Sequence, residues 1–267
     1  MKIFSRVQHN SRGSRNLFPS PGTTAKLFLT GGTLGPLVDS LHNQCLLRYD
    51  VAPINIYLPN TDSMDHPILA TSCLIPPLLG IAYVVLGGVL PQLVESFWST
   101  IAGIFPVNLD KANDQFENTL QTIDTKQRSQ TAIWAVLSTA LIIRFSQVLE
   151  TSHTFTDTQN LFIMMTAALT QWILLDRTPV ALVVAAITAL GGPLSELPFV
   201  ANGCWHYIPE ASNYFPLKDF QSNSILSYFF KHDYKELSLS SITGPCYFAV
   251  TTDAIALRRW FDCATKD

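Results

Sequence analysis

Charged residues are scarce in this sequence. Asp, Glu, Lys and Arg make up 14% of the 267 residues, whereas a typical soluble domain has about 25%. Hydrophobic residues account for 48%, and the mean hydropathy is +0.22. A soluble domain of this length would need more charge to cover its surface. The net charge of −3 and the lack of a basic, aromatic patch also argue against nucleic-acid binding.

Patterns that mark metal sites and common active sites are missing as well. The five cysteines are scattered without a CxxC pair, so a zinc site or a dense disulfide framework is not expected. The sequence contains no GxSxG, no HExxH, no phosphate-binding Walker loop and no GxGxxG leading into a helix. We therefore predict a protein without catalytic residues, metal ligands or cofactors.

Acidic residues are absent from the first 38 positions, which contain five Lys and Arg. Organelle transit peptides share this composition, but so do cytosolic tails whose positive charge fixes membrane topology. The segment lacks the apolar run of a secretory signal. We expect residues 1–26 to form a disordered, basic cytosolic tail, and a transit peptide stays open as the alternative.

Long apolar runs are what the sequence contains instead. A helix needs roughly 20 mostly apolar residues to cross the hydrocarbon core of a membrane. The run beginning at Pro179 starts with a favourable first helical residue, and the first run is the weakest because it contains several glycines, Asp39 and His42. The predicted spans lie near residues 27–47, 69–94, 131–149, 160–175, 179–199 and 242–257.

The distribution of Lys and Arg supports an even number of spans. With six spans, the tails and the loops on their side of the membrane contain twelve Lys and Arg, and the opposite side contains four. Positive residues favour the cytosolic side. We therefore predict an all-α, polytopic membrane protein: a bundle of six transmembrane helices over 27–260, both termini cytosolic, with a short C-tail at 261–267. The segments 95–130 and 211–240 have no predicted role.

Ionisable residues inside spans are costly and often functional, although those near helix ends can reach the interface. Asp39 and Arg144 are expected at similar depth, so an ion pair and two separate interface contacts are equally consistent with the pattern. Asp39 and His42 share a helix face, and with Arg144 they are the only candidates for a membrane-embedded enzyme. Glu196 and Asp253 are most simply interface residues.

Four motifs in order are similar to the Insig (insulin-induced gene) family of endoplasmic-reticulum membrane proteins. The second span has the spacing PPxxGx6GxxxP, LLDRT resembles the family's FDRS turn, NGCWHY resembles NGVYQY, and GPCYFA resembles LPCIFFAGG. The matched residues are Pro76, Pro77, Gly80, Gly87, Pro91, Asp176, Arg177, Asn202, Gly203, Tyr207, Pro245, Cys246, Phe248 and Ala249.

This resemblance implies a multi-pass protein of the endoplasmic-reticulum membrane that has no enzymatic activity. It implies a cleft for a sterol or other lipid, with Gln159, Tyr83 and Trp205 as candidate ligand-binding residues. It also implies sterol-sensing-domain partners, namely a Scap-like escort protein and HMG-CoA reductase, which the protein would retain or destabilise. The motif position assigns partner docking to Asp176, with Arg177 beside it.

Some features depart from the family pattern and keep other functions open. The third span ends in RFSQVLE rather than NHASAKVDF, and the sixth has Val250, Thr251 and Thr252 where glycines are expected. A small membrane lipid-binding or carrier protein without a sterol-sensing partner is the main alternative. It predicts an inverted repeat, which the sequence does not show. The identity of the ligand and the oligomeric state are left open.

Overall fold

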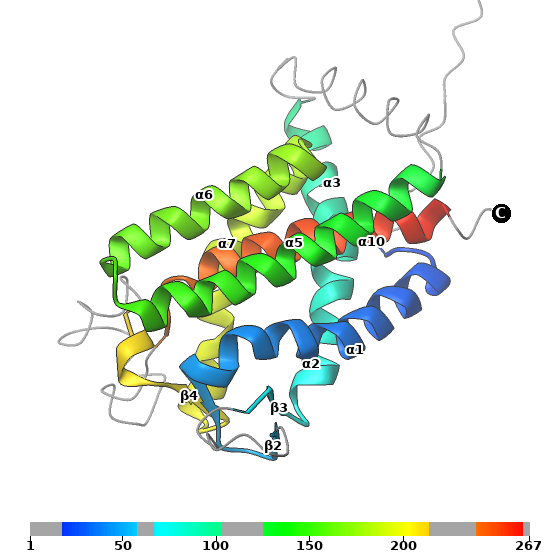
Figure 1. Cartoon of the computed structure of the whole chain (residues 1–267). Helices are drawn as coiled ribbons and strands as arrows, with labels where there is room; N and C mark the ends of the chain where they lie inside the picture. Colours follow the sequence, from blue (N-terminus) through cyan, green and yellow to red (C-terminus); the bar gives the residue numbers. More distant parts are fainter. Residues whose placement is uncertain (1–17, 58–66, 103–124, 214–238, 264–267) are drawn as a thin grey trace, which may run out of the picture.

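The computed structural model describes residues 18–57, 67–102, 125–213 and 239–263 (Figure 1). Most of the predicted N-tail, and large parts of the segments 95–130 and 211–240, lie outside these ranges. The described part is mostly helical. Its helical elements are α1 (Pro21–Leu46), α2 (Ile75–Tyr83), the π-helical turn η1 (Val84–Val89), α3 (Leu90–Ala102), α5 (Thr125–Ser152), α6 (Asp157–Leu175), α7 (Pro179–Ala201), the short 3₁₀ turn η2 (Pro209–Ala211) and α10 (Thr243–Cys263).

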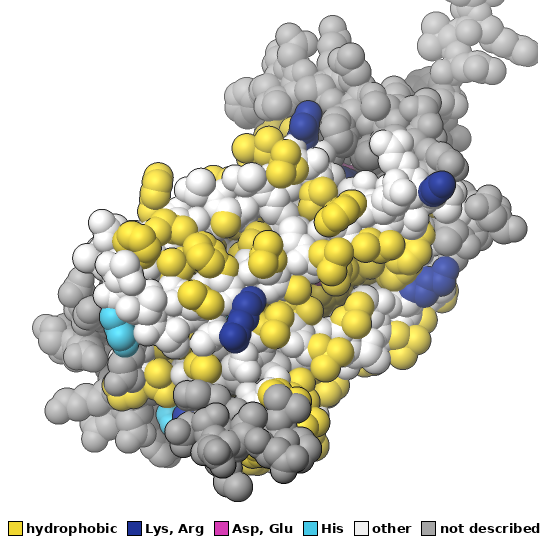
Figure 2. Space-filling view, viewed as in Figure 1, with side chains coloured by type: hydrophobic (Ala, Val, Ile, Leu, Met, Phe, Trp, Pro, Cys, Tyr) yellow, Lys and Arg dark blue, Asp and Glu magenta, His cyan; other side chains and the backbone are white. Residues whose placement is uncertain are grey.

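Six long helical segments correspond to the six predicted spans, because α2, η1 and α3 follow one another without a break. Three segments of the described chain are long and apolar enough to cross a membrane by themselves: Ile75–Trp98, Thr125–Ser152 and Pro179–Ala201. Large apolar side chains such as Leu141, Phe162 and Leu190 are exposed on the helices, and Figure 2 shows such side chains spread over the visible face with few charges between them. An apolar exterior of this kind is suited to lipid contact.

The prediction of a purely helical fold needs a correction, because two small antiparallel sheets join the helix ends. β1 (Leu47–Tyr49) pairs with β4 (Trp205–Tyr207), and β2 (Pro53–Ile56) pairs with β3 (Leu69–Ser72). Residues 69–72, expected inside the second span, are therefore a strand. The helix starts at Ile75 with Pro76 and Pro77 in its first turn, where the missing N–H of proline would have no helical partner anyway.

Hydroxyl side chains set the beginning of three helices. Ser20, Thr156 and Thr178 each accept a hydrogen bond from a backbone N–H in the first turn of α1, α6 and α7, respectively. These bonds satisfy donors that a helix leaves unpaired at its N-terminus. α1 begins at Pro21, six residues before the predicted boundary, because Ser20 and Pro21 together provide a cap and a first helical residue.

The centre of the bundle is α10, which packs against α5, α6, α7 and η1 (Figure 1). Its residues are buried almost without interruption from Thr243 to Leu257. This position explains why polar residues interrupt the last apolar run. Asp253, expected at the interface, is instead buried and accepts a 2.8 Å hydrogen bond from Tyr83.

The beginning of α1 and the end of α10 lie together. The Thr23 hydroxyl donates a 2.6 Å hydrogen bond to the carboxylate of Asp262. The two ends of the helical domain are therefore at the same end of the bundle, as an even number of crossings requires. Which side of a membrane this end faces stays a prediction.

The residues of the family motifs occupy helix ends and close helix contacts. Asn202 caps the end of α7, and Gly203 follows in the left-handed conformation (φ 67°) that glycine tolerates best. A Cβ on Gly87 would lie 2.4 Å from the carbonyl oxygen of Ala254 on α10, so only glycine allows this approach. The others are Pro76 and Pro77 in the first turn of α2, Gly80 against Phe28, Pro91 at the start of α3 and Pro245 at the start of α10.

Candidate functional site

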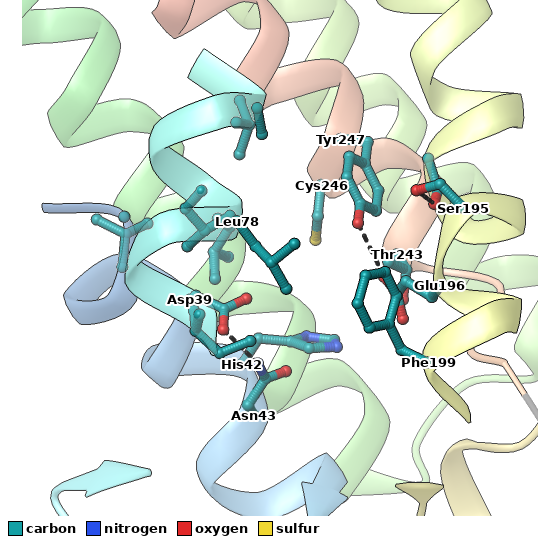
Figure 3. Close-up of a pocket in the computed structure, with 18 of the residues that line it drawn as sticks. Asp39, His42, Asn43, Leu78, Ser195, Glu196, Phe199, Thr243, Cys246 and Tyr247 are labelled. Carbon is teal, nitrogen blue, oxygen red and sulfur yellow. Dashed lines mark hydrogen bonds between the residues drawn. The ribbon is translucent and has the colours of Figure 1, made fainter. Parts of the chain in front are cut away.

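A cavity of about 510 Å³ lies between α1, α2, η1, α7 and α10 (Figure 3). Its walls are mainly apolar, with Val38, Leu78, Leu79, Phe199 and Val250 among the lining residues. The volume falls within the range of small-molecule sites, about 300–1,000 Å³. The cavity also has one polar region, to which α1, α7 and the β1–β4 sheet contribute.

Asp39 is part of a hydrogen-bonded group on the α1 side of the cavity. Its Oδ2 accepts a 2.5 Å bond from Asn43 Nδ2 and a 2.9 Å bond from the Tyr49 hydroxyl, and Asn43 also donates to Tyr49 at 2.7 Å. The proposed ion pair between Asp39 and Arg144 is therefore not formed. Arg144 is exposed, and its guanidinium lies near the side-chain amide of Gln44.

Glu196 is the second carboxyl group at the cavity and comes from α7. Its two oxygens accept separate hydrogen bonds, at 2.8 Å from the Tyr207 hydroxyl and at 3.0 Å from the Tyr247 hydroxyl. Glu196 is thus hydrogen-bonded within the protein, and its expected position at the membrane interface stays a prediction. The β1–β4 pairing places Tyr207 here, which a linear reading of the helix end could not reveal.

The two tyrosines outside the spans keep their protons. Burial, followed by the charge of Asp39, raises the pKa of Tyr49 well above its usual value. Burial, followed by the charge of Glu196, raises the pKa of Tyr207 in the same way. Both phenols therefore act as hydrogen-bond donors to the carboxyl groups.

His42 lies on the same face of α1 as Asp39, as the sequence spacing predicted, and both line the cavity. The imidazole is 5% exposed, and its Nδ1 is 2.7 Å from the hydroxyl of Ser146 on α5. Its Nε2 has no hydrogen-bond partner in the described structure. Figure 3 shows the ring extending from α1 toward α7.

The three predicted ligand residues have different positions. Tyr83 and Trp205 line the cavity, although the Tyr83 hydroxyl is already bonded to Asp253. Gln159 is not among the lining residues. It is exposed at the start of α6, where its side chain and Thr156 form a reciprocal capping box. The ligand-binding roles stay predictions, and the position of Gln159 gives no support for its role.

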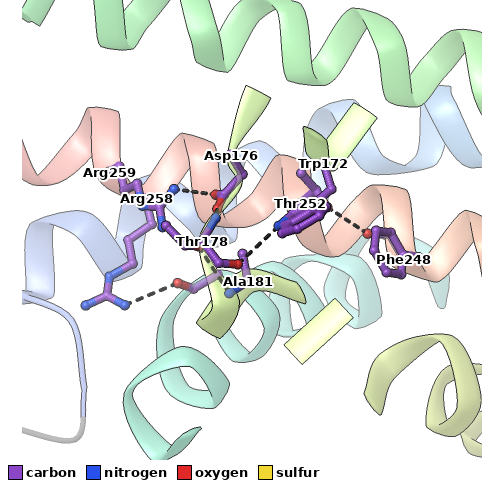
Figure 4. Close-up of polar contacts among 9 residues, drawn as sticks. Trp172, Asp176, Thr178, Ala181, Phe248, Thr252, Arg258 and Arg259 are labelled. Atoms are coloured by element: carbon purple, nitrogen blue, oxygen red, sulfur yellow. Dashed lines mark hydrogen bonds and ion pairs between the residues drawn. The ribbon is translucent and has the colours of Figure 1, made fainter. Parts of the chain in front are cut away.

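The predicted docking turn joins α6 to α7 (Figure 4). Asp176 is only 3% exposed. Its carboxylate forms an ion pair with Arg259 of α10 and accepts hydrogen bonds from the Thr178 hydroxyl and, at 2.8 Å, the Thr178 backbone N–H. Arg177 is exposed and does not pair with Asp176; its side chain donates to the carbonyl of Ile173.

This turn is tightly organised around Thr178. The Thr178 hydroxyl caps α7 through the Ala181 N–H at 3.2 Å, and its carbonyl accepts a 3.1 Å bond from the Trp172 indole. Arg177 adopts a left-handed backbone (φ 65°) and its N–H bonds to the Trp172 carbonyl at 3.0 Å, which closes α6. The turn is therefore a junction of α6, α7 and α10, and Arg259 is a member that sequence reasoning missed.

The described residues contain no group of three His, Cys, Asp or Glu side chains arranged to hold a metal ion. The site therefore offers an apolar cavity with two carboxyl groups, an imidazole and several tyrosines. Such a site can bind an amphiphilic molecule through burial of its apolar part and hydrogen bonds to its polar group.

The fold is similar to solved structures of a mycobacterial Insig homologue, MvINS from Mycobacterium vanbaalenii. A crystal structure of that protein has a TM-score of 0.54 and 16% identity, covering 89% of this chain and 92% of the other. A cross-linked MvINS trimer has a TM-score of 0.55 and 16% identity, covering 90% and 93%. No curated protein matches this sequence significantly.

The sequence model of the insulin-induced protein (INSIG) family matches residues 22–260, which include all six long helices up to the last turn of α10. This match covers most of the chain and agrees with the order of the motifs and with the fold. Membership supports a membrane protein with a general regulatory, non-enzymatic role in sterol homeostasis. The chain belongs to the insulin-induced protein (INSIG) family.

Proposed function

We propose that this protein is a lipid-responsive regulator in the endoplasmic-reticulum membrane that binds sterol-sensing-domain proteins. Its partners would be a Scap-like escort protein and an HMG-CoA reductase-like enzyme, which it retains or destabilises. The observation that carries this proposal is the largely apolar cavity of about 510 Å³ between α1, α2, η1, α7 and α10. Family membership over residues 22–260 supports the regulatory role.

The ligand would be a sterol or another lipid that enters the cavity with its apolar body against α2 and η1. The lining residues Leu78, Leu79 and Val85 come from these elements. Burial of apolar surface contributes roughly 25 cal/mol per Å², so a lipid would gain most of its affinity here. A bound lipid can shift partner binding only if it binds the partner-bound state more tightly than the free state.

The docking role of the α6–α7 turn takes a modified form. Asp176 is buried and bonded to Arg259 and Thr178, so its carboxylate would act on a partner by holding the shape of the turn. Arg177 is exposed and would provide the direct contact. Loss of Asp176 would then weaken partner binding because the junction of α6, α7 and α10 changes.

The test is recovery of a tagged sterol-sensing-domain protein by this chain, with and without added sterol. Ser195 is exposed and lines the cavity from α7, so Ser195→Phe should fill the cavity without displacing the core. We expect sterol to increase recovery for the wild type and for Ser195→Ala, but not for Ser195→Phe. If added sterol does not change the recovery of the partner by the wild type or by either variant, the sensor function is wrong.

A lipid-binding or carrier protein without a sterol-sensing partner is the second candidate. It is favoured by one observation, namely that the carboxylate expected to dock a partner is committed to Arg259 within the chain. Transfer of a fluorescent sterol between vesicles tests it. Transfer that Ser195→Phe abolishes, combined with no sterol-dependent partner recovery, would favour the carrier.

A further inference from the structure

Among the described residues, the polar region of the cavity presents mainly acceptors, because its tyrosine and asparagine donors bond within the wall. The hydroxyls of Tyr207 and Tyr247 donate to Glu196, and the Tyr49 hydroxyl donates to Asp39. Both protons of the Asn43 amide have partners, namely Asp39 and Tyr49. Each oxygen of Glu196 already accepts one of these bonds. Asp39 accepts both of its bonds on Oδ2, which leaves Oδ1 for a ligand.

His42 adds a further acceptor. We assign the single proton of the Ser146 hydroxyl to the Ile143 carbonyl, at 2.6 Å, and this assignment makes Nδ1 of the imidazole the donor in the 2.7 Å contact with His42. In the neutral ring, Nε2 then carries a lone pair. This atom is buried without a partner in the described structure and belongs to a residue that lines the cavity. A buried acceptor without a donor costs roughly as much as a lost hydrogen bond.

Positive charge is also missing among the described residues of the cavity wall. Asp39 and Glu196 line it, but none of the described lining residues is Lys or Arg. A carboxylate in an apolar, partly buried site needs a cation, a proton or a metal for compensation. The described residues do not offer a set of metal ligands here.

We propose that the polar region binds the ammonium group of a long-chain amino lipid. The ammonium would donate to Asp39, Glu196 and His42 Nε2. The apolar chain would lie against Leu78, Leu79 and Val250. This assignment rests on the proposed function in one respect, that the cavity takes a lipid. An anionic headgroup is excluded because it would face two carboxylates.

The first experiment compares two probes that differ in the charge of the nitrogen. The full chain in phosphatidylcholine nanodiscs is titrated with sphingosine, which carries an ammonium, and with N-acetylsphingosine, which is neutral. Because a hydrogen bond to a charged group contributes about tenfold or more to affinity, sphingosine should bind at least about tenfold more tightly. Equal affinity for the two probes would overturn the inference.

The second experiment removes each negative charge with little change of shape. Glu196→Gln and Asp39→Asn should each lower sphingosine affinity about tenfold and leave the affinity for N-acetylsphingosine unchanged. Asp50→Asn is the matched control, because Asp50 is exposed, pairs with His206 and does not line the cavity. A melting curve establishes that each variant is folded. If a variant is not folded, the comparison of sphingosine with N-acetylsphingosine on the wild type still decides the question.

A sterol titration separates this inference from the proposed function. If sterol binds and sphingosine does not, the amino-lipid assignment is wrong and the lipid cavity stands. If Ser195→Phe leaves the binding of every probe unchanged, the cavity is not the lipid site and both proposals fail.

Discussion

At the scale of single residues, the least expected finding is that Asp176 faces inward. Its side chain, 1% exposed, is bonded to Arg259, whose side chain is 23% exposed, and to Thr178. Removal of one member of a buried pair leaves the other without compensation, at a cost of about 3 kcal/mol. We therefore predict that Asp176→Asn and Arg259→Gln each lower the free energy of unfolding by about this amount, measured by denaturant titration in detergent.

A double-mutant cycle and a neighbouring residue provide the controls. The double variant should lose much less than the sum of the two single losses, because both remove the same interaction. Arg177→Gln should change the free energy of unfolding by no more than about 0.5 kcal/mol, since Arg177 is exposed and its side chain, among the described residues, bonds to a backbone carbonyl alone. Strictly additive losses would show that the pair contributes nothing to stability.

The sequence could place some site residues together and not others. Asp39 and His42 were expected on one helix face because their spacing alone determines this. The contacts of Asp39 with Tyr49 and of Glu196 with Tyr207 depend on the β1–β4 pairing. Strands of three residues are too short for their pairing to be predicted from the sequence. Arg259 is 83 residues from Asp176, so only the packing of α10 against the α6–α7 turn could identify the pair.

At the scale of elements, η1 and α10 depend on a glycine at their contact. A Cβ on Gly87 would lie 2.4 Å from the backbone oxygen of Ala254, which cannot move aside as a side chain could. We predict that Gly87→Ala lowers the free energy of unfolding by about 1–3 kcal/mol, the usual cost of overpacking. A melting curve in detergent would show this as a lower midpoint.

Gly191 on α7 is the matched control for this substitution. A Cβ there would meet nothing within 4 Å, and alanine has a higher helix propensity than glycine by about 1 kcal/mol. Gly191→Ala should therefore leave the midpoint unchanged or raise it. If Gly87→Ala is tolerated equally well, the helices do not require this close approach in solution.

Helices were easier to predict than their boundaries. Apolar runs marked the positions of the long segments, but the first and weakest run also needed the distribution of Lys and Arg to count as a span. The same criterion extended the second span back to residue 69, since Leu69 and Ala70 are apolar whether they form a strand or a helix. The proline pair at 76 and 77 was visible, but its use as a helix start depends on β3 pairing with β2.

At the scale of the whole molecule, the bundle has two chemically different ends. Thr23 of α1 and Asp262 of α10 meet at one end, together with Arg258 and Arg259. The two small sheets lie at the other ends of α1 and α7 (Figure 1). The excess of Lys and Arg on the side of the tails predicts that the first end is cytosolic.

Two native cysteines at opposite ends of the bundle can test this orientation. Cys73 is exposed directly after β3, and Cys263 is partly exposed at the end of α10. In variants that keep only one of them, an impermeant maleimide should label Cys263 in intact microsomes, whose outer surface is cytosolic. Cys73 should be labelled only after detergent opens the vesicles, because it would lie in the lumen. Labelling of both cysteines in intact vesicles would contradict an arrangement in which the two ends of the bundle face opposite sides of the membrane. Labelling of Cys73 alone would show that the orientation is the reverse of the predicted one.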